Sequence, residues 1–134
     1  LQQIAVSTIC HKDFCTLKPD FTIEKSINVM VKLKKSEGYL IDGDEKLLNK
    51  FELHQLISEK NKNKKISKLH QFKFLKLYSE SNIFESIEKS KDFVGESIPI
   101  VTKQNKMFGI ISEGDLFQIF LKVTREEKEL ENKD

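Results

Sequence analysis

The feature that most constrains the fold of this sequence is an internal repeat with a period of 60 residues. Shifting the 134-residue chain against itself by that distance places apolar residues on apolar residues without a gap. The matched pairs include Leu17 with Leu77, Ile23 with Ile83, Leu40 with Ile100, and Leu56 with Leu116. A repeat of this length is typical of one supersecondary unit that is copied and stacked. The sequence therefore predicts two copies, residues 1–62 and residues 63–134.

In the first copy, the apolar pattern alternates between strand and helix periods. Phe14–Leu17 predicts a short strand, and Thr22 predicts the N-cap of a helix that Gly38 ends. Tyr39–Ile41 predicts a second strand, and the turn at Asp42–Asp44 leads to a return strand and a second helix. The unit is β-α-β-β-α, an α+β arrangement. Because one unit alone leaves an apolar sheet face open, we expect the two copies to pack about a pseudo-two-fold axis.

The second copy follows the same order. Phe72 and Phe74 predict part of its first strand, because they lie at alternate positions before Leu77. Asn82 and Glu85 have the spacing of a capping box and predict the start of a helix. The charged residues 125–134 predict an extension of the last helix.

The segment from Gly109 to Asp115 carries the candidate chemistry. Gly109 allows a close approach to the backbone. Ser112 and Asp115 follow at the point where a strand becomes a helix. A hydroxyl, a carboxylate and free helix N–H groups would meet there, which suits a ribose and a phosphate. The same Ser-x-x-Asp spacing is also typical of a helix-capping box, and both interpretations can hold together.

Composition excludes several function classes. The chain is 38% hydrophobic and 33% charged, with a net charge of +2, which is too small to indicate a nucleic-acid partner. The two cysteines and three histidines lack the spacing of a metal site, and no nucleophile elbow or P-loop is present, so we expect neither a metal nor an enzyme.

The lysines of residues 60–65 could form a patch for phosphate or anionic lipid. The absence of interleaved aromatic residues favours a solvated linker instead.

With these residues in view, the sequence resembles a tandem pair of CBS domains over nearly its whole length. The second copy carries the family signature, an apolar strand with Pro99 followed by Gly-h-h-Ser-x-x-Asp, where h is an apolar residue. The resemblance implies a regulatory module that binds an adenosine-containing ligand such as AMP, ADP or ATP. It places adenine against Ile98 and Pro99, and ribose and phosphate near Gly109, Ser112 and Asp115.

The first copy departs from this signature. Asn49, Glu52 and Gln55 replace Gly109, Ser112 and Asp115. A carboxylate at position 52 would repel a phosphate, and an amide at position 55 cannot accept from a ribose diol as a carboxylate does. We therefore expect the first copy not to bind nucleotides, or to prefer another ligand.

A finer resemblance is to the cytosolic C-terminal region of bacterial CLC-type chloride channels and transporters. It rests on residues 92–101, on residues 111–117, and on residues 11–14. The absence of a starting Met agrees with an excised tail. The resemblance implies a location on the cytoplasmic side of the membrane and a transmembrane channel region of the same protein as partner.

The resemblance also implies a homodimer, because CBS-like pairs tend to pack helix faces against a second pair. The helices of both copies carry more apolar residues than one small core needs, such as Phe117, Ile119, Phe120 and Val123. Two alternatives to the chloride-channel tail stay open: a nucleotide-sensing module of another enzyme or transporter, and a dimerisation module without a ligand.

Overall fold

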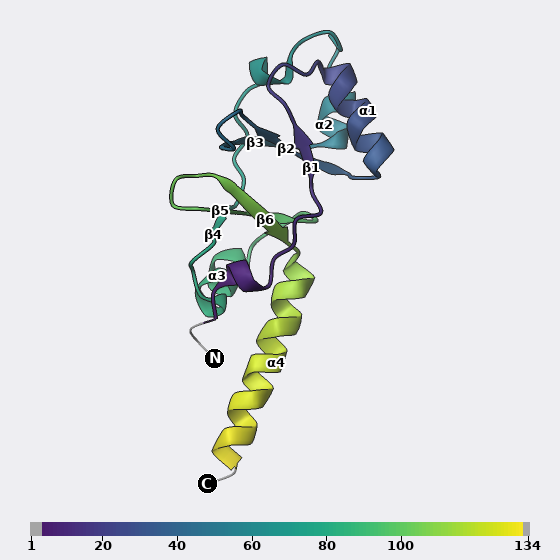
Figure 1. Ribbon diagram of the computed structural model, residues 1–134. Coiled ribbons are helices and arrows are strands. Elements are labelled where there is room, and N and C mark those ends of the chain that lie inside the picture. The colour runs from purple at the N-terminus through teal and green to yellow at the C-terminus, as the bar shows by residue number, and fades with distance from the viewer. Residues whose placement is uncertain (1–3, 133–134) are drawn as a thin grey trace. The chain divides into compact units, whose positions relative to one another are not determined.

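The structure is a computed structural model that describes residues 4–132, and it contains two three-stranded sheets with their helices (Figure 1). The elements in chain order are the 3-10 helix η1 (Val6–Thr8), β1 (Cys15–Leu17), α1 (Ile23–Leu33), β2 (Glu37–Ile41), β3 (Leu47–Glu52), α2 (Leu53–Ile57), the 3-10 helix η2 (Ile66–Lys68), β4 (Leu77–Tyr78), α3 (Ile83–Ser90), β5 (Ile98–Val101), β6 (Met107–Ile111) and α4 (Glu113–Asn132). This order confirms the α+β class and the β-α-β-β-α unit in both copies.

The chain forms two compact units that interleave along the sequence. Unit 1 contains residues 1–11, 75–102 and 108–134, and unit 2 contains residues 12–74 and 103–107. Each unit has its own sheet and its own apolar core, and each is described by itself below.

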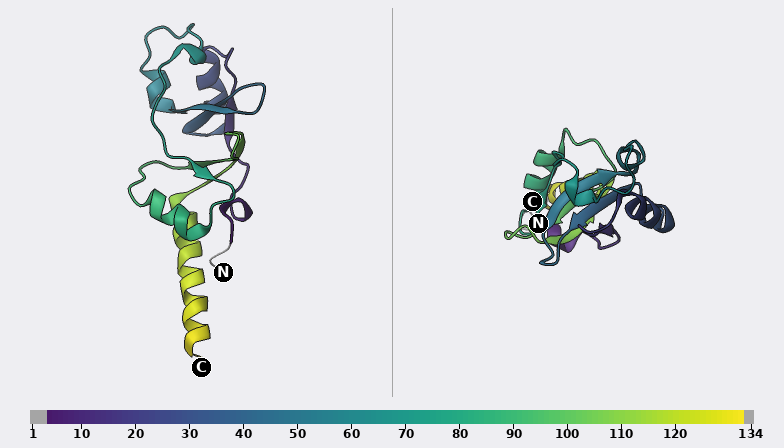
Figure 2. Two further views of the ribbon diagram at one scale, coloured as in Figure 1. Left: turned by 90° about the vertical axis from the view of Figure 1, so that its left-hand side faces the viewer. Right: turned by 90° about the horizontal axis from the view of Figure 1, so that it is seen from above.

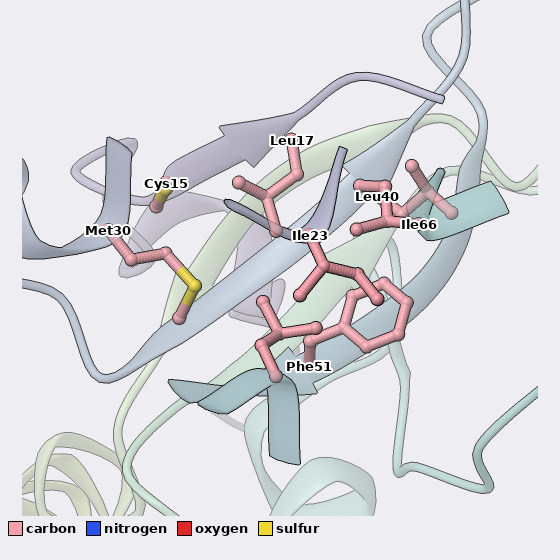
Figure 3. Close-up of a cluster of buried hydrophobic side chains, with 8 residues drawn as sticks. Cys15, Leu17, Ile23, Met30, Leu40, Phe51 and Ile66 are labelled. Atoms are coloured by element: carbon pink, nitrogen blue, oxygen red, sulfur yellow. The ribbon is translucent and has the colours of Figure 1, made fainter. Parts of the chain in front are cut away.

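Unit 2 is built on the sheet β1-β2-β3, in which β1 and β2 are parallel and β2 and β3 are antiparallel. Helices α1 and α2 pack against each other. Thr22 caps α1, because its hydroxyl accepts from the Lys25 N–H at 3.0 Å, as the sequence predicts. Figure 3 shows the buried core, whose members come from both helices, all three strands and η2. They are Cys15, Leu17, Ile23, Met30, Leu40, Phe51, Leu56 and Ile66.

Unit 1 is built on the sheet β4-β5-β6, in which β4 and β5 are parallel. Asn82 caps α3 by accepting from the Glu85 N–H at 2.9 Å, which confirms the predicted helix start. Helix α4 packs against α3 over its first half, and its C-terminal half runs past the other elements of the unit (Figures 1 and 2). No helix within residues 4–132 combines the length and the apolar character needed to span a membrane.

The two copies agree in local details as well as in element order. Glu45 and Asn105 lie 60 residues apart in equivalent turns, and both have left-handed backbones, with φ of 66° and 64°. Ser26 and Ser86 are both fully buried on the first helix of their copy. Each of these hydroxyls donates to the carbonyl four residues earlier.

The segment that precedes the first strand of each copy forms backbone hydrogen bonds with the other copy. The Ile23 N–H donates to the Lys64 carbonyl at 2.9 Å, and 60 residues later the Ile83 N–H donates to the Ile4 carbonyl at 3.1 Å. η1 therefore belongs to unit 1 and η2 to unit 2, each with its first residue fully buried. The boundary between residues 62 and 63 divides repeats rather than these units, and it stays a prediction.

The role predicted for Gly38 is wrong. Helix α1 ends at Leu33, and Lys34 takes a left-handed conformation with φ of 57°. Gly38 lies inside β2, where an added Cβ would come within 2.7 Å of the Leu17 side chain. Close packing of β2 on β1, and not the end of a helix, explains this glycine.

The predicted first strand of the second copy is too long. β4 spans only Leu77–Tyr78, and Phe72 and Phe74 lie before it in irregular structure. Phe72 instead packs edge-on against Phe51, with ring centroids 5.7 Å apart. The backbone of this segment hydrogen-bonds to the side chain of Asn49. The alternation of apolar residues in the sequence cannot predict such a bond.

Candidate functional site

The five predicted site residues all lie in unit 1, on β5, on β6 and at the start of α4. Ser112 directly precedes α4, and its hydroxyl accepts from the Asp115 N–H at 3.0 Å. Its carbonyl accepts from the Leu116 N–H at 3.2 Å. Ser112 is therefore the N-cap of α4, and Asp115 occupies the third helical position. The Asp115 side chain is exposed.

This helix start keeps functional groups available. The first N–H groups of an α-helix, here those of Glu113 and Gly114, have no acceptor within the helix. The Ser112 hydroxyl accepts from the backbone and can still donate its proton. The exposed Asp115 carboxylate can accept from neighbouring hydroxyls. Together these groups can bind a ligand that carries both a diol and an anion.

Gly109 serves a close approach within the chain itself. Its missing Cβ would lie 2.7 Å from the His11 carbonyl oxygen and 3.0 Å from the Cys10 sulfur. His11 and the neighbouring Ile110 exchange backbone hydrogen bonds of 3.0 and 2.8 Å. Gly109 therefore makes room for the backbone of the segment that contains His11. This close approach accounts for the glycine, and no ligand is needed to explain it.

Ile98 and Pro99 are buried in β5. Ile98 is fully buried and belongs to the core cluster of unit 1, together with Ile100 and Ile111. Within unit 1, Ile98 and Pro99 are part of the buried strand β5. Ser112 and Asp115 provide the polar atoms at the start of α4.

A cavity of about 350 Å³ lies between α3 and the first turn of α4. It is lined by Ile87, Ser90, Lys91, Glu113, Gly114, Leu116 and Phe117. None of the five predicted residues is among them. The lining residues from α3 were not predicted from the sequence. Residues 87, 90 and 91 nevertheless have the spacing of residues on one face of a helix.

The equivalent positions of the first copy are used by the chain itself. Asn49 is 3% exposed. Its amide donates to the His70 carbonyl at 3.1 Å and its oxygen accepts from the Phe72 N–H at 3.2 Å. Glu52 and Gln55 form a reciprocal capping box at the start of α2. These three side chains therefore have partners within unit 2, and the absence of a nucleotide site in the first copy stays a prediction.

The two cysteines lie in different units. Cys15 is fully buried in the core of unit 2, and this burial raises the pKa of its thiol, with a smaller opposing effect from Lys35. Cys10 donates to the Ser7 carbonyl at 3.4 Å. Residues 4–132 contain no group of three His, Cys, Asp or Glu side chains placed to hold a metal ion.

No protein-family model and no curated protein matches the sequence. Solved structures do match. The CBS pair domain of a candidate Mg²⁺ transporter from Shewanella oneidensis is similar over 92% of this chain and 74% of its own, with a TM-score of 0.82 and 8% identity. A protein from Thermotoga maritima with a CBS domain pair and an ACT domain is similar over 90% and 98%, with a TM-score of 0.74 and 15% identity.

The chain has the fold of a CBS-domain pair. Another structure with this fold is the cytosolic domain of the Mg²⁺ channel MgtE in complex with ATP, with a TM-score of 0.75, 13% identity, and coverage of 86% of this chain. The chain spans about half the length of that domain and of the soluble part of a magnesium transporter. These likenesses confirm the CBS-pair fold, and the chloride-channel resemblance stays a prediction.

Proposed function

We propose that this chain is a regulatory module that binds one adenine nucleotide at the start of α4. The observation that carries the proposal is the pairing of a capping hydroxyl, Ser112, with an exposed carboxylate, Asp115, at the N-terminus of a 20-residue helix in a CBS-pair fold. The Asp115 carboxylate would accept from the ribose hydroxyls. The helix N–H groups and the Ser112 hydroxyl would donate to the phosphate.

The first copy supports a stoichiometry of one. Asn49 is occupied by backbone bonds to residues 70 and 72, and Glu52 and Gln55 cap each other. A nucleotide there would have to break these bonds and approach a carboxylate of its own charge.

Calorimetry with AMP, ADP and ATP tests the proposal. Asp115→Ala should abolish the single binding event. Glu85→Ala is a matched control, because Glu85 is also the acidic third residue of a capped helix in unit 1. Both variants lose a similar helix-dipole contribution, typically about 0.3–1 kcal/mol. Unchanged binding in Asp115→Ala, or equal loss in the two variants, would reject the site.

The finer proposal is that the module is the cytoplasmic tail of a dimeric chloride channel or exchanger. It is supported by the resemblance of residues 92–101 and 111–117 to CLC proteins. The soluble part of a magnesium transporter and the cytosolic domain of the Mg²⁺ channel MgtE have this fold, which supports an ion transporter more generally. Regulation would occur by linkage, since a ligand that prefers one arrangement of the paired tails shifts gating by that affinity difference, typically about 1–3 kcal/mol.

Ion flux through the full-length protein in liposomes tests this finer proposal. Chloride flux should respond to nucleotide, and the response should disappear when the tail is removed. A full-length protein without membrane segments, or one that conducts Mg²⁺ and not chloride, would reject the chloride assignment. Flux that ignores both nucleotide and tail removal would favour the alternative of a dimerisation module, for which the exposed Phe117 provides an apolar contact.

A further inference from the structure

Charge is divided unequally between the two compact units. Unit 2 contains 16 Lys and 9 Asp or Glu residues, a net charge of +7. Unit 1 contains 7 Lys or Arg and 12 Asp or Glu residues, a net charge of −5. The overall value of +2 therefore conceals a basic unit and an acidic unit.

Residues 60–68, which hydrogen-bond to the start of α1, hold five of the 16 lysines of unit 2. This segment is fixed by backbone hydrogen bonds. The Glu24 N–H donates to the Lys62 carbonyl at 3.0 Å, and the Ile66 N–H donates to the Phe21 carbonyl at 2.9 Å. Thr22 and Lys65 also form an isolated β-bridge. The lysines of this segment are thus presented on an ordered backbone and not on a loose linker.

Five exposed lysines lie on this segment and in the first turn of α1, and we call them together the lysine edge. They are Lys25, Lys60, Lys64, Lys65 and Lys68. Within the described residues, none of the five forms an ion pair with a carboxylate. Lys62 differs, because its Nζ donates to the carbonyls of Ile57 and Glu59. The acidic residues nearest in sequence to these five lysines are Asp20, Glu24 and Glu59, so the edge keeps a net positive charge.

We propose that the lysine edge docks on the anionic surface of a lipid bilayer. Lysine ammonium groups act as strongly hydrated point charges, which suits diffuse attraction to headgroups. An exposed apolar side chain, Ile57, lies beside the segment and is 54% exposed. An anionic plane would attract unit 2 and repel unit 1.

A nucleic-acid partner fits this edge less well. Unit 2 contains no arginine, the residue that most often reads guanine in the major groove. Binding of single strands relies on aromatic side chains on which bases stack. Phe72, which follows the lysine segment, instead packs against Phe51.

This inference rests on the proposed function in one respect: a module beside a membrane would meet its anionic cytoplasmic leaflet. The test is co-sedimentation of the full chain with vesicles of phosphatidylcholine containing one third phosphatidylglycerol. Binding should occur at low salt and be lost at about 0.5 M salt, where screening acts within a few Å. Vesicles of pure phosphatidylcholine should not bind.

Two quadruple variants make the test specific. Replacing Lys60, Lys64, Lys65 and Lys68 by Gln should weaken vesicle partitioning by more than about a hundredfold, since each lysine contributes roughly a fivefold factor. Replacing Lys89, Lys91, Lys122 and Lys128 of unit 1 by Gln removes the same charge and should leave partitioning unchanged. Circular dichroism checks that both variants keep their helices.

Three outcomes would overturn the inference. They are no binding to anionic vesicles at low salt, equal loss in the two variants, and binding of DNA oligonucleotides without binding of vesicles. Nucleotide calorimetry on the same variants separates this inference from the proposed function. The lysine-edge variant should bind nucleotide normally, because Asp115 lies in the other unit.

Discussion

Gly109 and Gly114 lie five residues apart and show how differently two glycines can be constrained. A Cβ at Gly109 would meet the His11 carbonyl at 2.7 Å, a backbone atom that cannot move without disturbing its hydrogen bonds to Ile110. A Cβ at Gly114 would meet only the Ser112 hydroxyl, at 3.8 Å. Substitution by alanine should therefore destabilise the fold at position 109 and not at position 114.

We predict that Gly109→Ala lowers the free energy of unfolding by about 1–3 kcal/mol, as overpacking does. Gly114→Ala should be neutral or stabilising by up to about 1 kcal/mol, because alanine favours the helix. Urea denaturation followed by circular dichroism measures both. Equal stability of the two variants would show that His11 does not approach Gly109 as described.

Sequence reasoning identified the residues of the helix start more accurately than their surroundings. Ser112, Thr22 and Asn82 were predictable as caps, since capping depends on neighbours within three residues. The partners of Gly109 and Asn49 were not, because His11 and His70 are distant in sequence. The amino-acid pattern indicates that something approaches Gly109, but only the folded chain shows that it is the chain itself.

At the scale of elements, the segment that precedes the first strand of each copy packs in the unit that contains most of the other copy. This arrangement determines which fragments can fold. The repeat boundary predicts that residues 1–62 and 63–134 are marginal when separated. Residues 1–62 lack η2, and so lack Ile66, which is fully buried in the core of unit 2. Loss of one such side chain typically costs about 2–5 kcal/mol.

We predict that a fragment of residues 12–74 folds better than a fragment of residues 1–62. The fragment of residues 12–74 contains all six elements of unit 2 that are needed for its core, namely β1, α1, β2, β3, α2 and η2. Amide signals in a two-dimensional NMR spectrum should be dispersed for residues 12–74 and collapsed for residues 1–62. Equal dispersion would mean that the repeat, and not the interleaved unit, is the element that folds.

At the scale of the whole molecule, α4 has more apolar residues than unit 1 buries. Val123 is 3% exposed, and Phe120 packs edge-on against Phe84. Phe117 and Leu121, one helical turn apart, remain 56% and 41% exposed. The predicted homodimer would cover this apolar stripe.

We predict that Phe117→Glu makes the protein monomeric in sedimentation experiments at concentrations where the unmodified chain is a dimer. Val94→Glu is the control, since Val94 is 92% exposed on the loop between α3 and β5. A monomeric unmodified chain at high concentration would contradict the dimer. So would an equal response of the two variants.

The proposed function depends on one nucleotide site at the start of α4, and chemical-shift mapping tests this site most directly. Titration of the ¹⁵N-labelled chain with AMP, ADP and ATP should shift the amide signals of residues 109–116 for at least one nucleotide. The signals of residues 49–56 should change little, because Asn49, Glu52 and Gln55 are held by the chain itself. Shifts confined to residues 49–56, or no shifts with any of the three nucleotides, would contradict the account.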